Sequence, residues 1–306
     1  MFRKTISLAG AAALTVTLGS ALAPAHAETS AASAPCQLDL GSVTSAGAHT
    51  SQTIYATTPV TAGAVRTTSG VYQPGQVQHT TTFRNRYAVS GGNIRSGLVV
   101  LGGALYDSGY QTTAAGQVDP KYPVVNRRIG GGWSEYRWIE QSVQTALMTG
   151  EPLRTNLYAQ RTDGTFYRHT KVGNSWRNSG GMGGLTTMKS FALIDRDSGH
   201  DTFLANNRAG GLYTVRIPTA EPMRASSKVL RTSTWQVFEQ LIVTSCGSND
   251  SVVLGIDRDT KSAYLYLLRH ANGTSTVIEG LGKVPGTFTA SKYFRWAPEV
   301  DILNGE

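Results

Sequence analysis

The chain has 306 residues, of which 40% are hydrophobic and only 16% charged, and it contains 34 glycines. Its net charge of +8 at pH 7 is spread along the sequence, which is typical of a solvated surface. Attraction to anionic polymers such as teichoic acids or nucleic acid is the alternative, although no concentrated basic run exists and we expect no nucleic-acid partner. The composition favours short strands with tight turns over long helices.

The first 27 residues are predicted to be a secretory signal peptide. Arg3 and Lys4 begin it, residues 5–23 are uncharged and apolar, and Ala25-His26-Ala27 has the small-x-small form of a cleavage site. The alternative is an uncleaved membrane anchor, which the glycines and serine within the apolar stretch disfavour. No other apolar run reaches the length of a membrane span, so we expect a secreted, extracellular protein whose net charge falls to +6 after cleavage.

Residues 28–48 are rich in Ala, Ser, Thr and Gly, and we expect a flexible N-terminal arm before a folded domain of residues 49–306. The chain has two cysteines, Cys36 and Cys246. In an oxidising compartment an even pair of cysteines predicts a disulfide. This bond would tie the arm to the loop before the last full repeat.

Four stretches share one pattern, in which a short apolar run, a polar turn and an aromatic run follow one another. They are residues 97–106, 156–168, 201–215 and 250–266. Aligned on the apolar run, they are 57, 47 and 49 residues apart, as counted between Val100, Leu157, Leu204 and Val253. A period of this length with several short strands per unit predicts a β-propeller.

Each repeat is expected to hold four strands, and the two ends of the domain supply the rest. Residues 52–57, 64–68 and 71–78 resemble second to fourth strands, whereas residues 287–296 resemble a first strand with nothing full-length after it. Four whole repeats and this composite blade predict an all-β, five-bladed β-propeller closed by N- and C-terminal strands that share one blade. Residues 107–122 do not fit the pattern and are expected to be a long surface loop.

One segment is a candidate metal loop. Residues 195–201 place Asp195, Asp197 and Asp201 around a glycine, and alternating carboxylates can wrap a hard cation such as calcium. The further acidic ligand of a full calcium loop is missing. The alternative is a polar hairpin turn in which aspartates cap backbone amides, and the sequence shows no sign of any other cofactor.

Three tryptophans fall near the predicted blade boundaries, with charged or amide residues on the neighbouring turns. The tryptophans are Trp133, Trp176 and Trp235, and the turn residues are Arg161, Asp163, Asn207, Arg208, Asp257 and Arg258. Sugar rings stack on indole faces while their hydroxyls pair with planar donors and acceptors, so these residues are candidate ligand-binding sites at blade junctions. Repeated shallow sites would bind multivalently. The alternative is that each indole is a structural plug between blades.

Within this set, two groupings are favoured as binding pockets. The first combines Trp176 with Arg161 and Asp163, and the second combines Trp235 with Asn207 and Arg208.

Signals of catalysis are scarce. The histidines after residue 27 form no metal-spaced pair, and the sequence has neither a Gly-x-Ser-x-Gly elbow nor a phosphate-binding loop. Glu135 and Glu140 flank aromatic residues, but two carboxylates alone do not define a glycosidase. The chain is therefore predicted not to be an enzyme.

The blades resemble a known type. Gly-Gly-Gly-Trp at 130–133, Tyr136, Leu-Tyr-Ala at 157–159 and Asp-Gly-Thr-Phe-Tyr at 163–167 are similar to blades of secreted actinobacterial FG-GAP/VCBS-type and tachylectin-like propellers. The resemblance covers about residues 97–279. Because tachylectins bind sugars, it implies a lectin for cell-surface or cell-wall glycans, and the candidate metal loop resembles the calcium loops of FG-GAP blades.

Two other classes of function stay open. A lectin with repeated sites should keep the same polar set in each blade, yet the residues at 161/163, 207/208 and 257/258 differ. This drift favours a protein-interaction module that docks onto another secreted protein. The third class is a secreted hydrolase whose active site is built from residues distant in sequence.

Overall fold

The structure is a computed structural model that describes residues 35–146 and 149–306. The predicted signal peptide lies outside these residues, as does the first part of the predicted arm. Within them the fold is all-β, with one ten-stranded sheet, three four-stranded sheets and a single 3₁₀ turn, η1 (Gly273–Ser275). No helix in this described part is long and apolar enough to cross a membrane.

The three four-stranded sheets each follow one stretch of chain, and their strands pair antiparallel in sequence order. The first sheet contains β10 (Tyr136–Thr145), β11 (Pro152–Arg161), β12 (Phe166–Val172) and β13 (Ser175–Met182). The second contains β14 (Met188–Arg196), β15 (His200–Asn207), β16 (Leu212–Pro218) and β17 (Ser226–Arg231). The third contains β18 (Gln240–Cys246), β19 (Asp250–Asp257), β20 (Ser262–Arg269) and β21 (Val277–Lys283).

The ten-stranded sheet joins the two ends of the described chain. β22 (Lys292–Ala297) pairs antiparallel with β1 (Gln37–Val43) and parallel with β6 (Phe83–Tyr87). The sheet continues beyond β1 through β2 to β4, and beyond β6 through β7 to β9, with β5 paired to β7. These strands are β2 (His49–Tyr55), β3 (Thr61–Ala62), β4 (Arg66–Thr68), β5 (Val77–Thr80), β7 (Asn93–Leu101), β8 (Ala104–Gln111) and β9 (Val125–Gly130).

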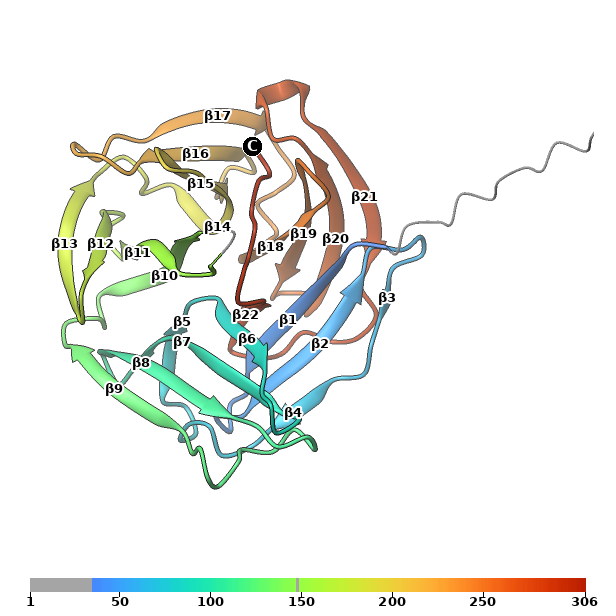
Figure 1. The fold of residues 1–306 in the computed structure, drawn as a ribbon. Helices are drawn as coiled ribbons and strands as arrows, with labels where there is room; N and C mark the ends of the chain where they lie inside the picture. The colour runs from blue at the N-terminus through green and yellow to red at the C-terminus, as the bar shows by residue number, and fades with distance from the viewer. Residues whose placement is uncertain (1–34, 147–148) are drawn as a thin grey trace, which may run out of the picture. The chain divides into compact units, whose positions relative to one another are not determined.

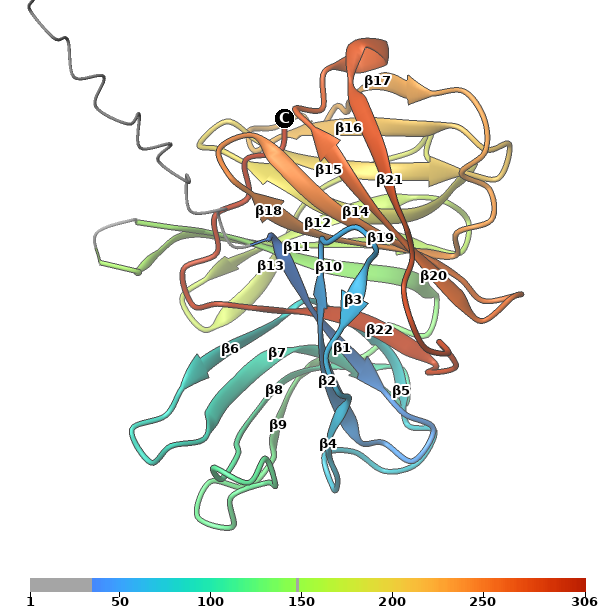
Figure 2. The same ribbon diagram turned by 90° about the vertical axis from the view of Figure 1, so that its right-hand side faces the viewer.

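The sheets are arranged around a common centre, which is the architecture of a β-propeller (Figure 1). β5, β10, β14, β18 and β22 lie nearest the centre, and each contacts the next in this series, with β22 contacting β5. Figure 2 shows the segment after β22 leaving the inner strands and running along one face to the C-terminus.

In five places a large buried side chain precedes an innermost strand and packs against the strands that come before it in the chain. We call these plug residues; they are Tyr72, Trp133, Leu185, Trp235 and Phe288, spaced by 61, 52, 50 and 53 residues. Tyr72 makes this contact within the ten-stranded sheet, and the other four make it between two sheets. All except Leu185 also donate their backbone N–H, at 2.9–3.0 Å, to a carbonyl in a turn between two of the earlier strands. These pairs are Tyr72 to Gly47, Trp133 to Gly103, Trp235 to Gly210 and Phe288 to Lys261.

The turns that receive the plug residues need a left-handed backbone. The φ angle is +80° at Gly47 and +89° at Gly164. A Cβ at these positions would lie 2.2 Å from the carbonyl oxygen of Tyr72 and 2.6 Å from Cα of Thr186. Glycine is required because it alone tolerates both the dihedral angle and the close approach of the next sheet.

The disulfide prediction is confirmed, since Cys36 and Cys246 are bonded with their Cα atoms 5.5 Å apart. The arm prediction is wrong for residues 37–43, because these form β1 and its Leu38 and Leu40 are buried. Their alternation of polar and apolar residues is that of a strand. The predicted loop 107–122 also begins as strand, since β8 continues to Gln111.

His49, at the start of β2, is the centre of a buried aromatic cluster. Its ring centroid lies 5.1–5.7 Å from five aromatic rings, those of Tyr72, Phe83, Tyr110, Phe294 and Trp296. Its Nδ1 is 2.8 Å from the Tyr110 hydroxyl. Burial, with a smaller contribution from the charge of Arg95, lowers the pKa of His49 to about 3.

Acid should therefore destabilise this cluster. The unfolded chain binds a proton at His49 near pH 6.5 and the folded chain does not. The contribution of His49 to the free energy of unfolding is therefore complete above that pH and decreases as the pH drops toward 3. Between pH 7.5 and 4.5 the loss from this group is about 2–3 kcal/mol. Urea unfolding at both pH values measures the free energy of unfolding, and its loss on acidification should be smaller in His49→Gln than in the parent protein. If both proteins lose the same amount, His49 is not the group responsible.

Candidate functional site

A cavity of about 350 Å³ lies among the innermost strands. Eight basic and four acidic side chains line it, which gives its wall a net charge of +4. The basic residues are Arg84, Arg137, Lys189, Arg196, Arg208, Arg258, Lys292 and Arg295, and the acidic ones are Glu140, Glu239, Glu299 and Asp301. Aromatic side chains, among them Trp138 and Tyr293, complete the wall.

One end of the cavity carries five cations, which we call the basic rim: Arg137, Lys189, Arg208, Arg258 and Lys292. Three of them stand at the starts of β10, β14 and β22, and the other two lie on the turns after β15 and β19. Each strand-start cation is the fourth residue after a plug residue, as is Glu239 before β18. The plug contacts therefore set the position of the rim.

Three guanidinium groups of the basic rim are held by neutral backbone carbonyls. Arg137 donates to the Met188 oxygen at 2.8 Å, Arg208 to Thr186 at 3.1 Å and Arg258 to Ser291 at 3.0 Å. These bonds fix the groups without neutralising their charge.

Lys189 differs from the other rim cations, because its Nζ lies 2.6 Å from Oε1 of Glu239. Within residues 35–146 and 149–306, no ion pair within 4.0 Å involves Arg137, Arg208, Arg258 or Lys292. Burial and repulsion from Lys292 lower the pKa of nearby His79 to about 4, so this imidazole is neutral at pH 7. The rim thus presents four uncompensated positive charges.

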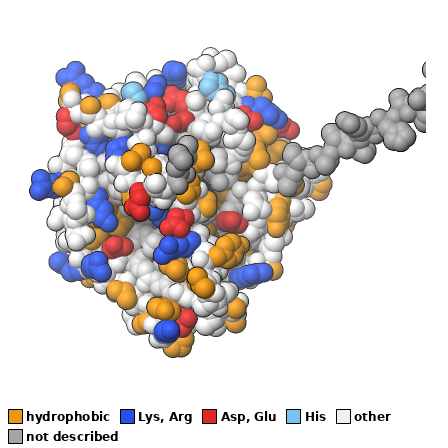
Figure 3. Space-filling view, in the orientation of Figure 1, with side chains coloured by type: hydrophobic (Ala, Val, Ile, Leu, Met, Phe, Trp, Pro, Cys, Tyr) orange, Lys and Arg blue, Asp and Glu red, His pale blue; other side chains and the backbone are white. Residues whose placement is uncertain are grey.

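The opposite end of the cavity is covered by the C-terminal segment. Lys189 and Arg196 are seven residues apart on β14, about 23 Å along an extended strand. Arg196 and Arg295 there bind Asp301, with Arg295 donating to both carboxylate oxygens at 2.7 and 2.6 Å. The two guanidinium groups outweigh burial and hold the pKa of Asp301 at about 2. Figure 3 shows this face, where acidic and basic side chains mix around the centre.

Glu140 on β10 stands in the cavity wall between two sheets. Its carboxylate accepts hydrogen bonds from the backbone N–H of Thr82 at 3.0 Å and from the Thr82 hydroxyl at 3.1 Å. The Gln141 N–H adds a third at 2.7 Å. Burial nevertheless raises the pKa of Glu140 above its usual value.

Two of the three predicted sugar-stacking tryptophans are core residues. Trp133 is 8% exposed and stacks on Tyr136 with ring centroids 4.7 Å apart. Trp235 is 4% exposed and packs against Phe238 and Tyr266. Both are plug residues, so their faces are covered by protein and neither indole is open to a sugar.

The structure does not bring Trp176 together with Arg161 and Asp163. Trp176 begins β13 and pairs with Lys171 near the end of β12, whereas the other two residues lie before β12 starts. The separation along β12 is about 17 Å. Arg161 and Asp163 do lie together, with Nε 3.8 Å from Oδ2. Arg161 also binds Glu135, and Asp163 accepts the Thr165 N–H at 2.8 Å.

The remaining predicted turn residues divide into two groups. Asn207 and Asp257 hold their own turns, because Asn207 accepts the Gly211 N–H at 2.7 Å and Asp257 accepts the N–H groups of two following residues at 3.0 and 3.1 Å. Arg208 and Arg258 reach the central cavity. Two of the predicted ligand-binding residues are therefore part of the basic rim.

The three aspartates of the predicted calcium loop point to different partners. The Asp197 carboxylate caps the N–H groups of Gly199 and His200, both at 2.6 Å, and Asp195 accepts the Glu306 N–H at 3.3 Å. Residues 195–201 thus form the capped turn that was the alternative interpretation. In the described part of the chain, no group of three His, Cys, Asp or Glu side chains has a metal-holding arrangement.

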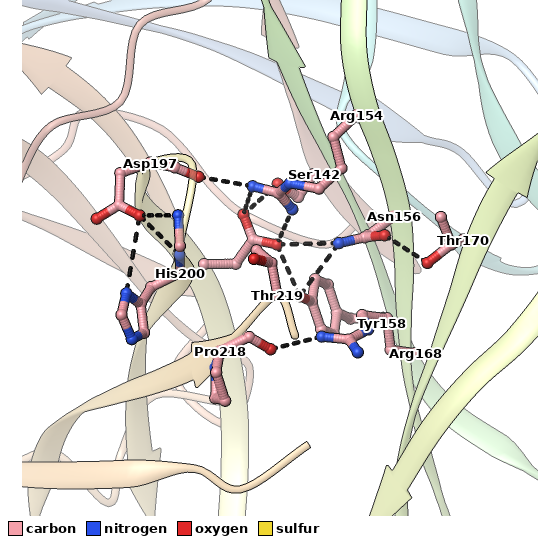
Figure 4. Close-up of polar contacts among 12 residues, drawn as sticks. Ser142, Arg154, Asn156, Tyr158, Arg168, Thr170, Asp197, His200, Pro218 and Thr219 are labelled. Atoms are coloured by element: carbon pink, nitrogen blue, oxygen red, sulfur yellow. Dashed lines mark hydrogen bonds and ion pairs between the residues drawn. The ribbon is translucent and has the colours of Figure 1, made fainter. Parts of the chain in front are cut away.

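Asp201, on β15 of the second four-stranded sheet, is fully buried, and Figure 4 labels the four residues that donate hydrogen bonds to it. It accepts hydrogen bonds from Arg154 at 2.5 Å, Tyr158 and Ser142 at 2.6 Å, and Asn156 at 3.3 Å. All four donors come from β10 and β11. The cluster joins two sheets, because the Asp201 carboxylate is paired with Arg154 and both of its oxygens accept hydrogen bonds. It leaves no oxygen free for a metal.

Sequence reasoning missed Arg137, Lys189, Lys292 and Glu239. The repeats were aligned on their apolar runs. Had they been aligned on the large side chain before each innermost strand, these four residues would have fallen at one equivalent position. The signal is a charged residue four positions after that side chain.

Neither the protein-family models nor the curated proteins include a match to this sequence. Solved structures with a similar fold include the catalytic domain of the Coprinopsis cinerea GH62 α-L-arabinofuranosidase, with 12% identity over 70% of this chain and 71% of that chain and a TM-score of 0.43. The fucose-specific lectin from Aleuria aurantia has 9% identity, coverages of 76% and 74% and a TM-score of 0.44. The GH43_1 enzyme from Xanthomonas citri complexed with xylotriose has 14% identity over 67% of this chain and 74% of that chain, with a TM-score of 0.38.

These similarities concern the fold and assign no function to this chain. They do correct one prediction. The exclusion of enzyme activity is contradicted, because GH62 and GH43 glycoside hydrolases stand beside lectins among the similar structures.

The two kinds of tryptophan should differ in their effect on stability. Trp235→Ala removes a buried plug and should lower the free energy of unfolding by about 3–5 kcal/mol. Trp176→Ala removes a half-buried ring on an outer strand and should cost clearly less. Chemical denaturation of both variants tests this; equal losses would show that Trp235 does not join the sheets.

Proposed function

We propose that this protein is a secreted, five-bladed β-propeller that binds carbohydrate in its central cavity. The five plug residues and the series of innermost strands support five blades, with β22 completing the blade of β1 and β2. In this proposal the ligand site is central and single, in place of the repeated junction sites inferred from the sequence.

The cavity is the observation that carries the proposal. Its volume of about 350 Å³ lies in the range of small-ligand sites. Its wall combines apolar surface with carboxylate, amide and guanidinium groups, which suit vicinal hydroxyls through paired hydrogen bonds. Gln141 and Glu239, which also line the cavity, supply acceptors in addition to the donors of the basic rim.

A glycan array probed with the full chain should identify oligosaccharide ligands. Single-site affinity should be about 0.1–1 mM, as expected for a few hydrogen bonds and limited apolar contact. Gln141→Trp, which fills the cavity, should weaken binding more than tenfold, whereas Val172→Trp, at the exposed end of β12, should not. Calorimetry gives both affinities; undiminished binding by Gln141→Trp would place the site elsewhere.

Glycoside hydrolysis is the second candidate, and two carboxyl groups of the same cavity favour it. Burial raises the pKa of Glu140, whereas two arginines hold that of Asp301 at about 2. Carboxyl groups whose environments move their pKa values apart suit a general acid and a permanently ionised partner. Under this candidate, Glu140 protonates the leaving oxygen.

Incubation of the chain with the oligosaccharides found on the array tests hydrolysis. If Glu140 is the acid, Glu140→Gln should slow cleavage at least about 100-fold while retaining binding. Chromatography of the products measures the cleavage rate of the parent protein and of the variant. Intact oligosaccharide after long incubation with the parent protein would exclude hydrolysis of that ligand.

A further inference from the structure

We infer that the central cavity selects an acidic oligosaccharide whose sugars carry carboxylate groups. This inference rests on the proposed carbohydrate function and adds the chemical class of the ligand. The observation behind it is the basic rim, in which four of the five positive charges have no acidic partner within the described residues.

The rim arginines are oriented before any ligand arrives. Arg208 and Arg258 each use one N–H for a backbone carbonyl and keep the other donors of the guanidinium fork. Arg137 is held more fully, because its Nε–H donates to Gln160 and its Nη2 group donates to two backbone carbonyls. A carboxylate matches that fork with two parallel hydrogen bonds, which are stronger than those to a neutral hydroxyl. Because the arginines are already held, little side-chain entropy is lost on binding.

Lys292 provides a further positive charge. Within the described residues, no hydrogen bond or ion pair is formed by its Nζ. Burial, together with repulsion from Arg258, lowers its pKa, and burial with repulsion from Arg208 does the same for Arg137. An anion at the rim would relieve both repulsions.

The shape of the cavity favours a single oligosaccharide chain over a bulky polyanion. The far end is covered by the C-terminal segment, and there the Asp301 carboxylate binds both Arg196 and Arg295 and offsets part of their charge. A ligand therefore meets uncompensated charge at the rim and a mixed polar and aromatic wall deeper in. This order suits an acidic sugar whose ring enters and whose carboxylate stays at the rim.

The test compares trigalacturonic acid with its fully methyl-esterified form, which has the same sugars without the charge. The full chain should bind the acid at least about tenfold more tightly in 50 mM NaCl, and the difference should shrink in 500 mM NaCl because salt screens the rim. Lys292→Gln should weaken binding of the acid about tenfold and leave the ester unchanged. Arg258→Gln, at an exposed position, is the second variant in case the first does not fold.

Lys171→Gln is the matched control, because it removes the same charge from an exposed site on β12 outside the cavity. It should leave both affinities unchanged. Equal binding of acid and ester would overturn the inference while leaving the carbohydrate function intact. The same conclusion would follow if neutral oligosaccharides bound on the array and trigalacturonic acid did not. Failure of every glycan, neutral or acidic, would overturn the proposed function as well.

Discussion

Each innermost strand of this protein is fixed to the strands before it by a plug residue whose side chain is buried and whose backbone N–H, in four of five cases, bonds to a turn between those strands. The contact combines apolar burial with a directional bond, so it sets both the distance and the register between sheets. Everything at the centre depends on this register. The fourth residue after the plug lies at or next to the start of the innermost strand. Its charge consequently faces the same end of the cavity in several sheets.

The strands of the repeats could be predicted because the middle strands carry short apolar runs, such as Val252 to Leu254, bounded by glycine-containing or aspartate-containing turns. β1 could not, because its alternation is short and lies in a stretch whose Ala, Ser and Thr content is typical of a linker. The disulfide followed from cysteine number alone. The site was harder, since Arg137, Lys189 and Lys292 are far apart in sequence and share only their offset from a plug. Trp133 and Trp235 were correctly placed at sheet boundaries, but a sequence does not reveal whether an indole face is covered.

Charge is distributed unequally between the two ends of the cavity. At the covered end, Asp301 neutralises much of the charge of Arg196 and Arg295, and the pair belongs to the packing of the C-terminal segment. At the rim, carbonyl oxygens take the place of carboxylates as partners. Carbonyl bonds orient a guanidinium while leaving its long-range field intact, and low-dielectric walls concentrate such a field along the cavity axis. The same residue type therefore has a structural role at one end and an electrostatic one at the other.

The position of β22 has a consequence for biosynthesis. β1 is among the first strands to be translated, yet its partner β22 is among the last, about 250 residues later. At ordinary translation speeds this interval is roughly 12–50 s. During that time the inner edge of β1 has no partner, and an open strand edge is a template for pairing with other chains. The nascent chain would depend on chaperones or delayed folding until its final residues appear, and a ribosome stalled before β22 would release an aggregation-prone product.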